Sequence, residues 1–453
     1  MDASASLRTG AAHQATRLDA LGGRFDPWLL GCTITLACLG VVMVGSAAVA
    51  GAGMDVGPWY FLTRHVMFLA AGLVLAGLLM RTELKFIEQR SQLLLLACFV
   101  LLLLVFVPGI GKTVNGAQRW INLGVSNFQV VEAVKLLYIV WLASYLKRYS
   151  EDVAVTWMAM LKPLGVAVAM VGLLLLQPDF GSSTLLLAIT AGMLVLGGVN
   201  LPRMSMPIVF GLPVFAFIAI LEPYRMRRFT SFLDPWADQL GSGYQLSNAL
   251  MAVGRGEWFG VGLGASVQKL SYLPEAHTDF IMAVIAEELG FAGVCLVVGL
   301  FALLGGRAFW LGLKCVEMRR HFAGYCAFGI ALWMSLQSFV SIGVNLGLLP
   351  TKGLTLPLIS SGGSSVLMTC AALGLLLRVS YEYDRAARQV AKLRGVASGP
   401  PIGSAPQPSP SPVAADPGHR GTSRLRQRVE PSLGARDAAA QDSAALIALR
   451  RSR

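Results

Sequence analysis

The chain has 453 residues, of which 55% are hydrophobic and 14% are charged, and its formal net charge is +12. This composition and the mean hydropathy of +0.63 are typical of a polytopic membrane protein and exclude a soluble globular domain. Seven cysteines without paired spacing and five scattered histidines predict neither disulfides nor a protein-ligated metal site. A glycine-rich nucleotide loop is also absent, which disfavours a pump driven by ATP, and we expect no nucleic-acid partner.

Residues 1–27 lack the charged start and the short apolar core of a secretory signal, so we expect an uncleaved polar tail. Ten apolar runs follow, and each is long enough to cross about 30 Å of hydrocarbon. They lie near residues 28–50, 59–80, 92–108, 129–146, 163–177, 183–199, 207–222, 279–303, 322–345 and 361–381.

Ten spans place both termini on the same side of the membrane. The loops on that side carry a series of basic residues, which makes the side cytoplasmic: Arg81, Lys85, Arg90, Lys147, Arg148, Lys162, Arg203, Arg307, Lys314, Arg319 and Arg320. We therefore predict an all-α polytopic membrane protein with ten transmembrane helices, re-entrant loops on the outer face and both termini in the cytoplasm.

The loop between the third and fourth spans is predicted to be an interfacial hairpin, because aromatic and basic residues alternate in it. Lys112 and Arg119 can hold a phosphate group, or Arg119 can extend along the membrane surface to reach water; both readings stay open. Glu132 and Lys135 then lie three apart on one helical face. This spacing favours a buried intramembrane ion pair with a structural role.

The segment from Gln177 to Ser183 contains Pro178 and Gly181 at membrane depth. Irregular backbone at this depth is tolerated only where it is buried in protein or lines a polar cavity. Asp179 is therefore either a cap of the next helix or a cavity residue.

The loop at about 222–278 is basic and rich in aromatic residues, and its arginines include Arg225, Arg227 and Arg228. We expect it to lie on the bilayer surface at the outer face. A loop of this kind suits a ligand with a phosphate head and a lipid tail.

The most informative segment runs from Leu273 to Gly290. It places Glu275, His277 and Asp279 at the start of a long apolar helix, and Glu287 with Glu288 about two turns deeper. Ionisable groups at or inside a membrane span are costly unless they are paired or wetted, so they mark functional sites. Capping by Asp279 is the alternative, but it does not explain the two deeper glutamates.

Another outer loop, residues 349–365, is interrupted by proline and glycine and has Lys352 as its single charge. We expect Lys352 to pair with a carboxylate on the same face, Asp279 above all, which would keep that carboxylate ionised. Exposure of Lys352 to headgroup water is the alternative. After residue 383 the chain becomes rich in proline, serine and arginine. The predicted organisation is thus a tail at 1–27, a membrane domain at 28–383 and a disordered basic cytoplasmic tail at 384–453.

With these segments in view, the chain resembles the SEDS family (shape, elongation, division and sporulation). Four motifs carry the resemblance: NGAQRWINLG at 115–124, LQPDFGSS at 176–183, KLSYLPEAHTDF with AEELG at 269–290, and LPTKGLTLPLISSGGSS at 349–365. Lys352 favours the division branch of the family. The departures are Val130-Val131, Ser361 and Ser271, and none of them removes a candidate catalytic group.

The resemblance implies a peptidoglycan glycosyltransferase that polymerises lipid II at the outer side of the bacterial inner membrane, at the division septum. It implies Asp279 as general base, with Lys352, Arg119 and Arg227 around the pyrophosphate. Glu275, His277 and Asp179 are further candidates for substrate binding. A divalent cation, Mg²⁺ or Mn²⁺, could bridge the pyrophosphate to a carboxylate.

The implied partners are a septal class B penicillin-binding protein of the FtsI type and other division proteins such as the FtsQ-FtsL-FtsB complex. Two other classes stay open. A lipid II flippase or other transporter would use Glu132, Glu287 and Glu288 as relay groups. A non-catalytic division scaffold would tolerate neutralisation of Asp279.

Overall fold

The computed structural model describes residues 22–48, 59–114, 116–122, 124, 126–221, 223–270 and 272–397. The tails predicted for 1–27 and 384–453 lie largely outside the described residues, as does Ser271.

Each of the ten apolar runs forms a helix. The helices are α2 (Pro27–Ala48), α3 (Tyr60–Arg81), α5 (Ser91–Leu104), α6 (Val130–Arg148), α8 (Trp157–Leu176), α9 (Phe180–Leu196), α10 (Leu201–Ile220), α13 (Ile281–Glu317), α14 (His321–Asn345) and α15 (Gly363–Ala397). Within the described residues, α2, α3, α8, α13, α14 and α15 are long and apolar enough to cross a membrane, and α5, α9 and α10 are shorter apolar helices. The chain is thus a mostly helical, polytopic membrane protein.

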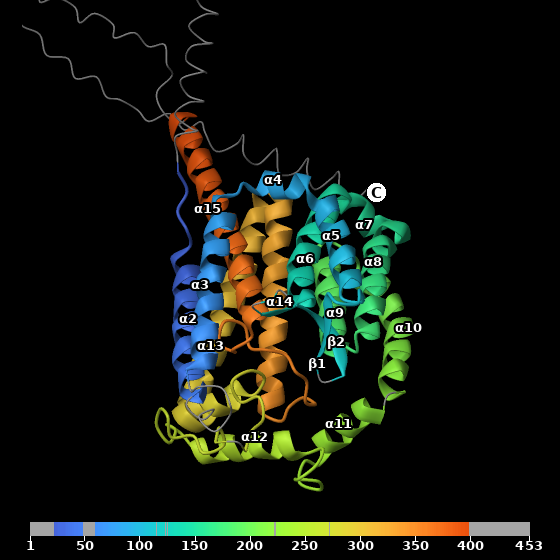
Figure 1. Cartoon of the computed structure of the whole chain (residues 1–453). Helices are drawn as coiled ribbons and strands as arrows, with labels where there is room; N and C mark the ends of the chain where they lie inside the picture. Colours follow the sequence, from blue (N-terminus) through green and yellow to red (C-terminus); the bar gives the residue numbers. More distant parts are fainter. Residues whose placement is uncertain are drawn as a thin grey trace, which may run out of the picture. The chain divides into compact units, whose positions relative to one another are not determined.

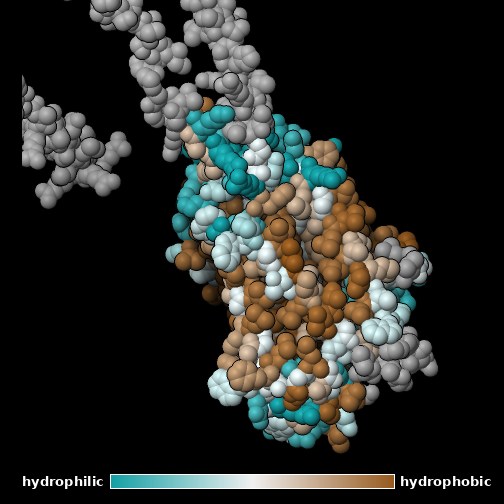
Figure 2. All heavy atoms as spheres, turned by 90° about the vertical axis from the view of Figure 1, so that its left-hand side faces the viewer, coloured by the Kyte–Doolittle hydropathy of each residue, from teal (hydrophilic) through white to brown (hydrophobic). Residues whose placement is uncertain are grey.

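The surface of the bundle agrees with this assignment. Figure 2 shows a broad apolar band between two more hydrophilic ends. Large side chains such as Leu73, Val74 and Leu96 are more than half exposed on the helices. A contiguous apolar surface of this extent is rare on soluble proteins and marks contact with lipid.

Short helices close both ends of the bundle (Figure 1). At one end lie α4 (Leu84–Gln89) and α7 (Ser150–Val155), and at the other lie α11 (Pro223–Leu233) and α12 (Tyr244–Gly256). The predicted loop at 222–278 therefore contains two helices, which run across the end of the bundle.

One correction to the all-α prediction concerns residues 111–129, where the expected hairpin is a small antiparallel sheet. Its strands are β1 (Gly111–Val114), β2 (Ala117–Asn122) and β3 (Asn127–Gln129), in the order β1-β2-β3. The backbone N–H of Gln129 donates to Ser364 Oγ at 2.9 Å, which ties the sheet to the start of α15. The sheet fixes the position of Arg119 on its central strand.

Helix α13 is broken at Gly290, where φ is +66°, a left-handed value that favours glycine. The segment after α12 fills the break: Val261 N–H donates to the Glu287 carbonyl at 3.0 Å, and Phe291 N–H donates to the Glu257 carbonyl at 2.9 Å. The backbone groups freed by the kink are thus satisfied inside the protein, as membrane depth requires.

A second correction concerns the predicted boundary at residue 383. Helix α15 continues to Ala397, so residues 384–397 are helical rather than part of a disordered tail. An i,i+4 ion pair, Arg388 to Asp384 at 2.8 Å, supports the extension. Asp384 also accepts a hydrogen bond from the backbone N–H of Arg24 at 2.7 Å, which anchors the helix to the start of the chain.

Candidate active site

Asp279 lies directly before α13, and its backbone is held by two other elements. Asn345, at the end of α14, donates from Nδ2 to the Asp279 carbonyl at 2.9 Å and accepts from Ala283 N–H at 3.1 Å. The loop before α15 binds the same turn, because Ser360 Oγ donates to the Thr278 carbonyl at 2.7 Å. The position of Asp279 is thus fixed by a buried amide and a loop far away in sequence.

The Asp279 carboxylate is not a helix cap. Phe280 is the N-cap residue of α13, and no side chain caps the helix there. Instead the carboxylate faces the loop at 349–365: a Cβ atom added to Gly353 would lie 2.8 Å from Asp279 Oδ2. Glycine at 353 therefore leaves the space that this carboxylate occupies.

The surroundings of Asp279 favour its neutral form. Burial raises the pKa of Asp279 to about 7, with a further rise from the negative charge of Glu275 and an opposing effect of the Arg228 guanidinium. A carboxyl group with a pKa near 7 can accept and return a proton at neutral pH. Perturbed groups of this kind are concentrated at functional sites.

A cavity of about 470 Å³ opens beside Gly353. Three cations line it, together with one carboxylate and a set of apolar side chains: Arg119, Arg228, Lys352, Asp179, Phe180, Ala216, Ile220, Met226 and Phe229. The size is typical of ligand sites, and the mixed lining suits a ligand with an anionic group and an apolar chain.

The three cations come from different parts of the chain. Arg119 is held on β2 by its Nε, which donates to the Gln177 carbonyl at 3.1 Å, and by a short hydrogen bond to the Pro178 carbonyl. Lys352 places its Nζ 4.6 Å from the centroid of the Phe180 ring. Arg228, on α11, donates to the Thr351 carbonyl at 3.0 Å. These contacts hold the cations in place at the cavity wall.

Two of the predicted cations lie in surroundings other than those we expected. Arg227 is exposed and does not line the cavity, whereas its neighbour Arg228 does. Consecutive residues of a helix point about 100° apart, and the side of α11 that faces the cavity carries Met226, Arg228 and Phe229. The expected ion pair of Lys352 with Asp279 is also not formed among the described residues, because the ammonium lies over Phe180 instead.

The remaining candidates have identifiable positions. Asp179 caps α9, since Oδ1 accepts from Ser182 N–H at 3.1 Å, and it also lines the cavity. Glu275 accepts from Thr278 Oγ1 at 2.7 Å. His277 packs against Phe61 with the ring centroids 4.0 Å apart. Burial lowers the pKa of His277, and the charge of Glu275 opposes this shift.

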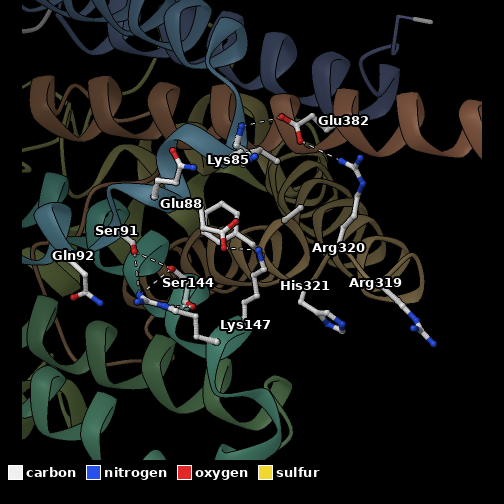
Figure 3. Close-up of a pocket in the computed structure, with 15 residues that line it drawn as sticks. Lys85, Glu88, Ser91, Gln92, Ser144, Lys147, Arg319, Arg320, His321 and Glu382 are labelled. Carbon is white, nitrogen blue, oxygen red and sulfur yellow. Dashed lines mark hydrogen bonds and ion pairs between the residues drawn. The ribbon is translucent and has the colours of Figure 1, made fainter. Parts of the chain in front are cut away.

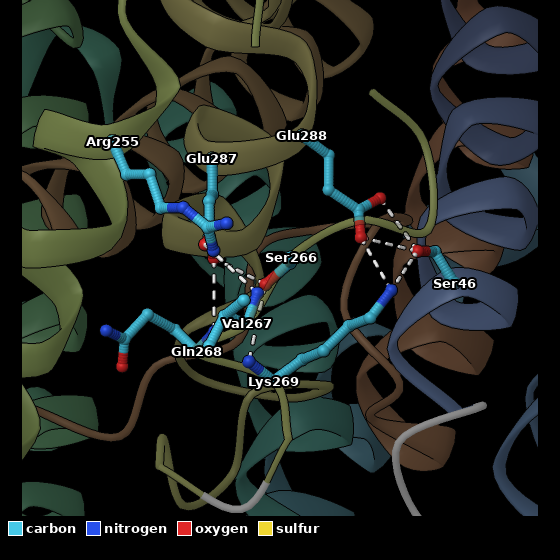
Figure 4. A network of polar contacts seen from close by, with 8 residues as sticks. All are labelled: Ser46, Arg255, Ser266, Val267, Gln268, Lys269, Glu287 and Glu288. Atoms are coloured by element: carbon cyan, nitrogen blue, oxygen red, sulfur yellow. Dashed lines mark hydrogen bonds and ion pairs between the residues drawn. The ribbon is translucent and has the colours of Figure 1, made fainter. Parts of the chain in front are cut away.

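The buried glutamates of the bundle are paired. Lys135 Nζ lies 2.9 Å from Glu132 Oε1 and also donates to Gln337 at 2.7 Å. Glu287 and Glu288 extend in different directions from α13 (Figure 4). Glu287 meets Arg255 at 2.9 Å, and Glu288 meets Lys269 at 2.7 Å. These ion pairs give each buried carboxylate a cation partner, although Glu132 Oε2 has no hydrogen-bond partner among the described residues.

Metal ligands are not gathered at the site. No group of three or more His, Cys, Asp or Glu residues placed to hold a metal ion occurs in the part of the chain that the structure describes. A divalent ion would therefore need oxygens from a bound ligand in addition to Asp179 or Asp279.

Sequence reasoning missed several residues that position the site. Asn345, Ser360 and Gly353 set the place of Asp279, and Arg228 completes the cationic wall. Asn345 is a polar residue at the end of an apolar span, a signal that was present in the sequence. The roles of Ser360 and Gly353 depend on the contact of their loop with Asp279 and Thr278, which no local sequence pattern reveals.

The fold and the site together define a polytopic membrane protein with a carboxylate and a cation-lined cavity at one end of its bundle. A model of the FtsW, RodA and SpoVE family, described as "Cell cycle protein", matches residues 27–385. The chain therefore belongs to this family, the SEDS proteins.

Curated relatives are similar along most of their length. A protein of Xanthomonas oryzae pv. oryzae, named "Probable peptidoglycan glycosyltransferase FtsW", is 63% identical over 95% of this chain and 94% of its own. A protein of Coxiella burnetii with the same name is 48% identical over 80% of this chain and 97% of its own.

Solved structures have the same fold. A chain from a structure titled "Structural coordination of polymerization and crosslinking by a peptidoglycan synthase complex" is 33% identical, with a TM-score of 0.66, over 79% of this chain and 98% of that chain. The rod shape determining protein RodA of Thermus thermophilus is 29% identical, with a TM-score of 0.58, over 79% of this chain and 96% of that chain.

Proposed function

We propose that this protein is a septal peptidoglycan glycosyltransferase that polymerises lipid II into β-1,4-linked glycan strands, with Asp279 as general base. One observation carries the role of Asp279: a carboxyl group with a pKa of about 7 lies beside a cavity lined by three cations, in a member of the SEDS family. Names of the curated relatives support the glycosyltransferase activity.

The reaction joins two lipid-linked sugars. The 4-hydroxyl oxygen of the acceptor attacks the anomeric carbon of the donor, the bond from that carbon to the pyrophosphate oxygen breaks, and the hydroxyl proton passes to Asp279. Attack from the side opposite an α-linked pyrophosphate gives the β-1,4 bond. General-base help of this kind contributes about 10²–10⁴-fold to a rate.

The cavity suits the leaving group. Arg119, Arg228 and Lys352 would stabilise the charge that develops on the pyrophosphate, and the apolar wall with Ile220 and Phe229 would hold the start of the lipid chain. A Mg²⁺ or Mn²⁺ ion bound to the pyrophosphate would neutralise further charge, with Asp179 at the same cavity as a nearby carboxylate.

The proposal includes the topology of the membrane domain. We assign all ten long helices as spans, with both termini in the cytoplasm and α11, α12 and Asp279 at the outer face. The basic residues at the opposite end, among them Arg81, Lys147 and Arg320, support this orientation. It places the cavity where lipid-linked sugars are joined outside the bacterial inner membrane.

A class B penicillin-binding protein of the FtsI type is the proposed partner, and the FtsQ-FtsL-FtsB complex a further one at the septum. Similarity to a chain of a solved peptidoglycan synthase complex supports the first partner. A transpeptidase held beside the cavity would crosslink the strands as they form.

The transporter alternative has less support. A proton relay needs carboxylates that can change protonation state, whereas Glu132, Glu287 and Glu288 each have a cation within 2.9 Å. These three glutamates therefore have a structural role in this proposal.

The decisive experiment supplies labelled lipid II and a divalent cation to the purified protein with its class B partner, the transpeptidase being inactivated. We expect polymer from the wild type and at least a 100-fold lower rate from Asp279→Asn. The variant should unfold at the same or a higher temperature at pH 8, because it removes a charge that burial disfavours.

Glu275→Gln is the matched control, since it removes an exposed carboxylate next to the site and should retain most of the activity. Equal polymer from wild type and Asp279→Asn would exclude Asp279 as the base. No polymer from any sample with a folded complex would return the question to the transporter and the scaffold.

A further inference from the structure

A second cavity, of about 640 Å³, lies beside α4, at the end of the bundle opposite α11 and α12 (Figure 1), and Figure 3 shows the side chains around it. It is formed by α4, the start of α5, the end of α6, the turn between α13 and α14, and one residue of α15. Its polar lining consists of Lys85, Glu88, Gln89, Ser91, Gln92, Ser144, Lys147, Arg148, Arg319, Arg320, His321 and Glu382. None of these groups takes part in the proposed reaction.

The lining has an excess of positive charge. Five Lys and Arg side chains face two carboxylates, so the formal excess is three positive charges with histidine neutral. Glu88 pairs with Lys147 at 2.6 Å. Glu382 pairs with Arg320 at 3.3 Å and with Arg378, outside the lining, at 3.0 Å.

The excess therefore rests on Lys85, Arg148 and Arg319, which have no carboxylate partner among the described residues. Arg148 is held by neutral groups only: one guanidinium nitrogen donates to the hydroxyls of Ser91 and Ser144, each at 3.3 Å. A fixed guanidinium without a counter-ion is suited to bind an anion.

The start of α14 borders the same cavity. The N-cap residue of α14, Arg320, makes no side-chain cap bond, and the first helical residues, His321, Phe322 and Ala323, line the cavity. Their N–H groups lie in the first turn of the helix, where they lack intrahelical acceptors and favour an anion.

An excess of Lys and Arg at the cytoplasmic end is common in membrane proteins and would by itself indicate only a solvated basic surface. That explanation does not account for a hollow of about 640 Å³ whose wall combines a helix start with three cations that lack a carboxylate partner among the described residues. A bound anion would satisfy both at once.

We propose that this cavity is a binding site for a phosphate group, supplied either by the headgroup of an anionic phospholipid or by a soluble phosphate compound. A glycerophosphate headgroup fits the volume, since ligand sites range from about 300 to 1,000 Å³. The site lies at the opposite end of the bundle from α11 and α12 and stands independently of the proposed reaction.

The first arm of the test measures lipid binding to the full-length protein in nanodiscs of phosphatidylcholine with phosphatidylglycerol, by the ratio of the two lipids that remain bound after extraction. The cavity variant is Arg148→Gln with Arg319→Gln. Each lost cation should weaken phosphatidylglycerol binding about fivefold, so the double variant should weaken it about 25-fold.

The matched control, Arg81→Gln with Lys314→Gln, removes the same charge at the same end of the bundle outside the cavity and should bind like the wild type. Arg319→Gln alone, at an exposed side chain, covers the case that the double variant does not fold. The second arm adds inorganic pyrophosphate to protein in neutral detergent and measures the rise in unfolding temperature.

Loss of the phosphatidylglycerol preference in the cavity variant alone assigns the site to a lipid headgroup. Loss of stabilisation by pyrophosphate in that variant, without a lipid preference in the wild type, assigns it to a soluble phosphate. Equal losses in cavity and control variants, or no phosphate effect in either arm, would overturn the proposal.

Discussion

Asp279 and the glutamates Glu132, Glu287 and Glu288 are all carboxylates shielded from water by the fold, yet their surroundings differ. Glu132, Glu287 and Glu288 are at most 3% exposed, and each has a cation within 2.9 Å. Asp279 lies at the end of the bundle, with no hydrogen bond to its carboxylate among the described residues and a pKa raised to about 7.

The difference teaches how a buried carboxylate can be assigned a role. A carboxylate that is paired with a cation inside the protein contributes to folding, because removal of the partner leaves an uncompensated charge. A carboxylate held in place through its backbone, with no cation partner and no hydrogen bond to its oxygens among the described residues, keeps its bonding capacity for a ligand. The presence or absence of a cation partner therefore separates the two roles better than depth does.

Among the paired glutamates, the largest loss of stability is expected for Lys269→Met, which removes the cation partner of Glu288. The change leaves Glu288, which is fully buried, with Ser46 as its remaining side-chain partner. Breaking a buried ion pair on one side costs about 3–5 kcal/mol. Thermal unfolding in detergent should show a strongly destabilised protein, whereas Asp279→Asn should not be destabilised.

A second substitution distinguishes pairing from proton relay. Glu288→Gln in the Lys269→Met background removes the uncompensated charge and should restore most of the stability. If Lys269→Met were as stable as the wild type, the structural assignment of Glu288 would be wrong. If folded Glu288→Gln protein lost all polymerisation, a direct functional role would replace it.

The pH dependence of polymerisation tests the proposed role of Asp279 as general base. A general base acts in its deprotonated form, so the rate should be constant well above pH 7 and fall about tenfold per pH unit below it, reaching about 100-fold at pH 5. The fall occurs at neutral pH because the pKa of Asp279 is raised. Initial rates in matched buffers across pH 5–9 give the profile.

Glu275→Gln supplies the control for this profile. The charge of Glu275 contributes to the raised pKa of Asp279, so its removal should move the midpoint of the profile to lower pH without a large change in the plateau. A midpoint that stays in place would mean that the profile reports another group, such as the substrate.

The two neighbouring arginines of α11 provide a matched pair. Arg228→Gln should lower the polymerisation rate about tenfold or more, because a hydrogen bond to a charged group contributes about 1.5–3 kcal/mol and this cation lines the cavity. Arg227→Gln removes the same charge from an exposed position and should have little effect. Reversed or equal effects would contradict the placement of α11.

Part of the fold could be predicted from sequence. Apolar length located helices of which six are long and apolar enough to cross a membrane within the described residues, and the pairing of Glu132 with Lys135 followed from their spacing. The sheet at 111–129 was only partly predicted, because its pairing depends on contacts between short strands with few buried residues. The helical extension past residue 383 was missed because composition, rather than helix-forming local pairs, set the boundary.

The site was predictable to a similar degree. Arg119, Asp179 and Lys352 do meet at one cavity, because residues of the same membrane face are brought to the same end of a bundle. The choice between Arg227 and Arg228 could not be made, since it depends on the rotation of α11 against the bundle. The partner of Lys352 was missed because Phe180, an apolar neighbour, gave no sign of an interaction with a cation.

The smallest expected effect tests whether the space around Asp279 matters. A Cβ atom at residue 353 would lie 2.8 Å from Asp279 Oδ2, so Gly353→Ala must displace the carboxylate by a few tenths of an ångström. Because a misplacement of about 1 Å costs on the order of 100-fold, this shift should lower the rate about threefold with unchanged folding.

Gly181→Ala is the control in the same cavity, since its added Cβ would make only an ordinary contact, 3.7 Å from Leu354. It reduces the volume of the cavity without touching Asp279, and its rate should equal that of the wild type. A threefold loss in Gly353→Ala together with an unchanged rate in Gly181→Ala would show that the position of the carboxylate, rather than the volume of the cavity, limits the reaction. Equal losses in the two variants would instead assign the effect to the space available for substrate. In that case a small displacement of the Asp279 carboxylate would not limit the reaction, whereas displacement of a carboxylate in a buried ion pair is expected to cost stability.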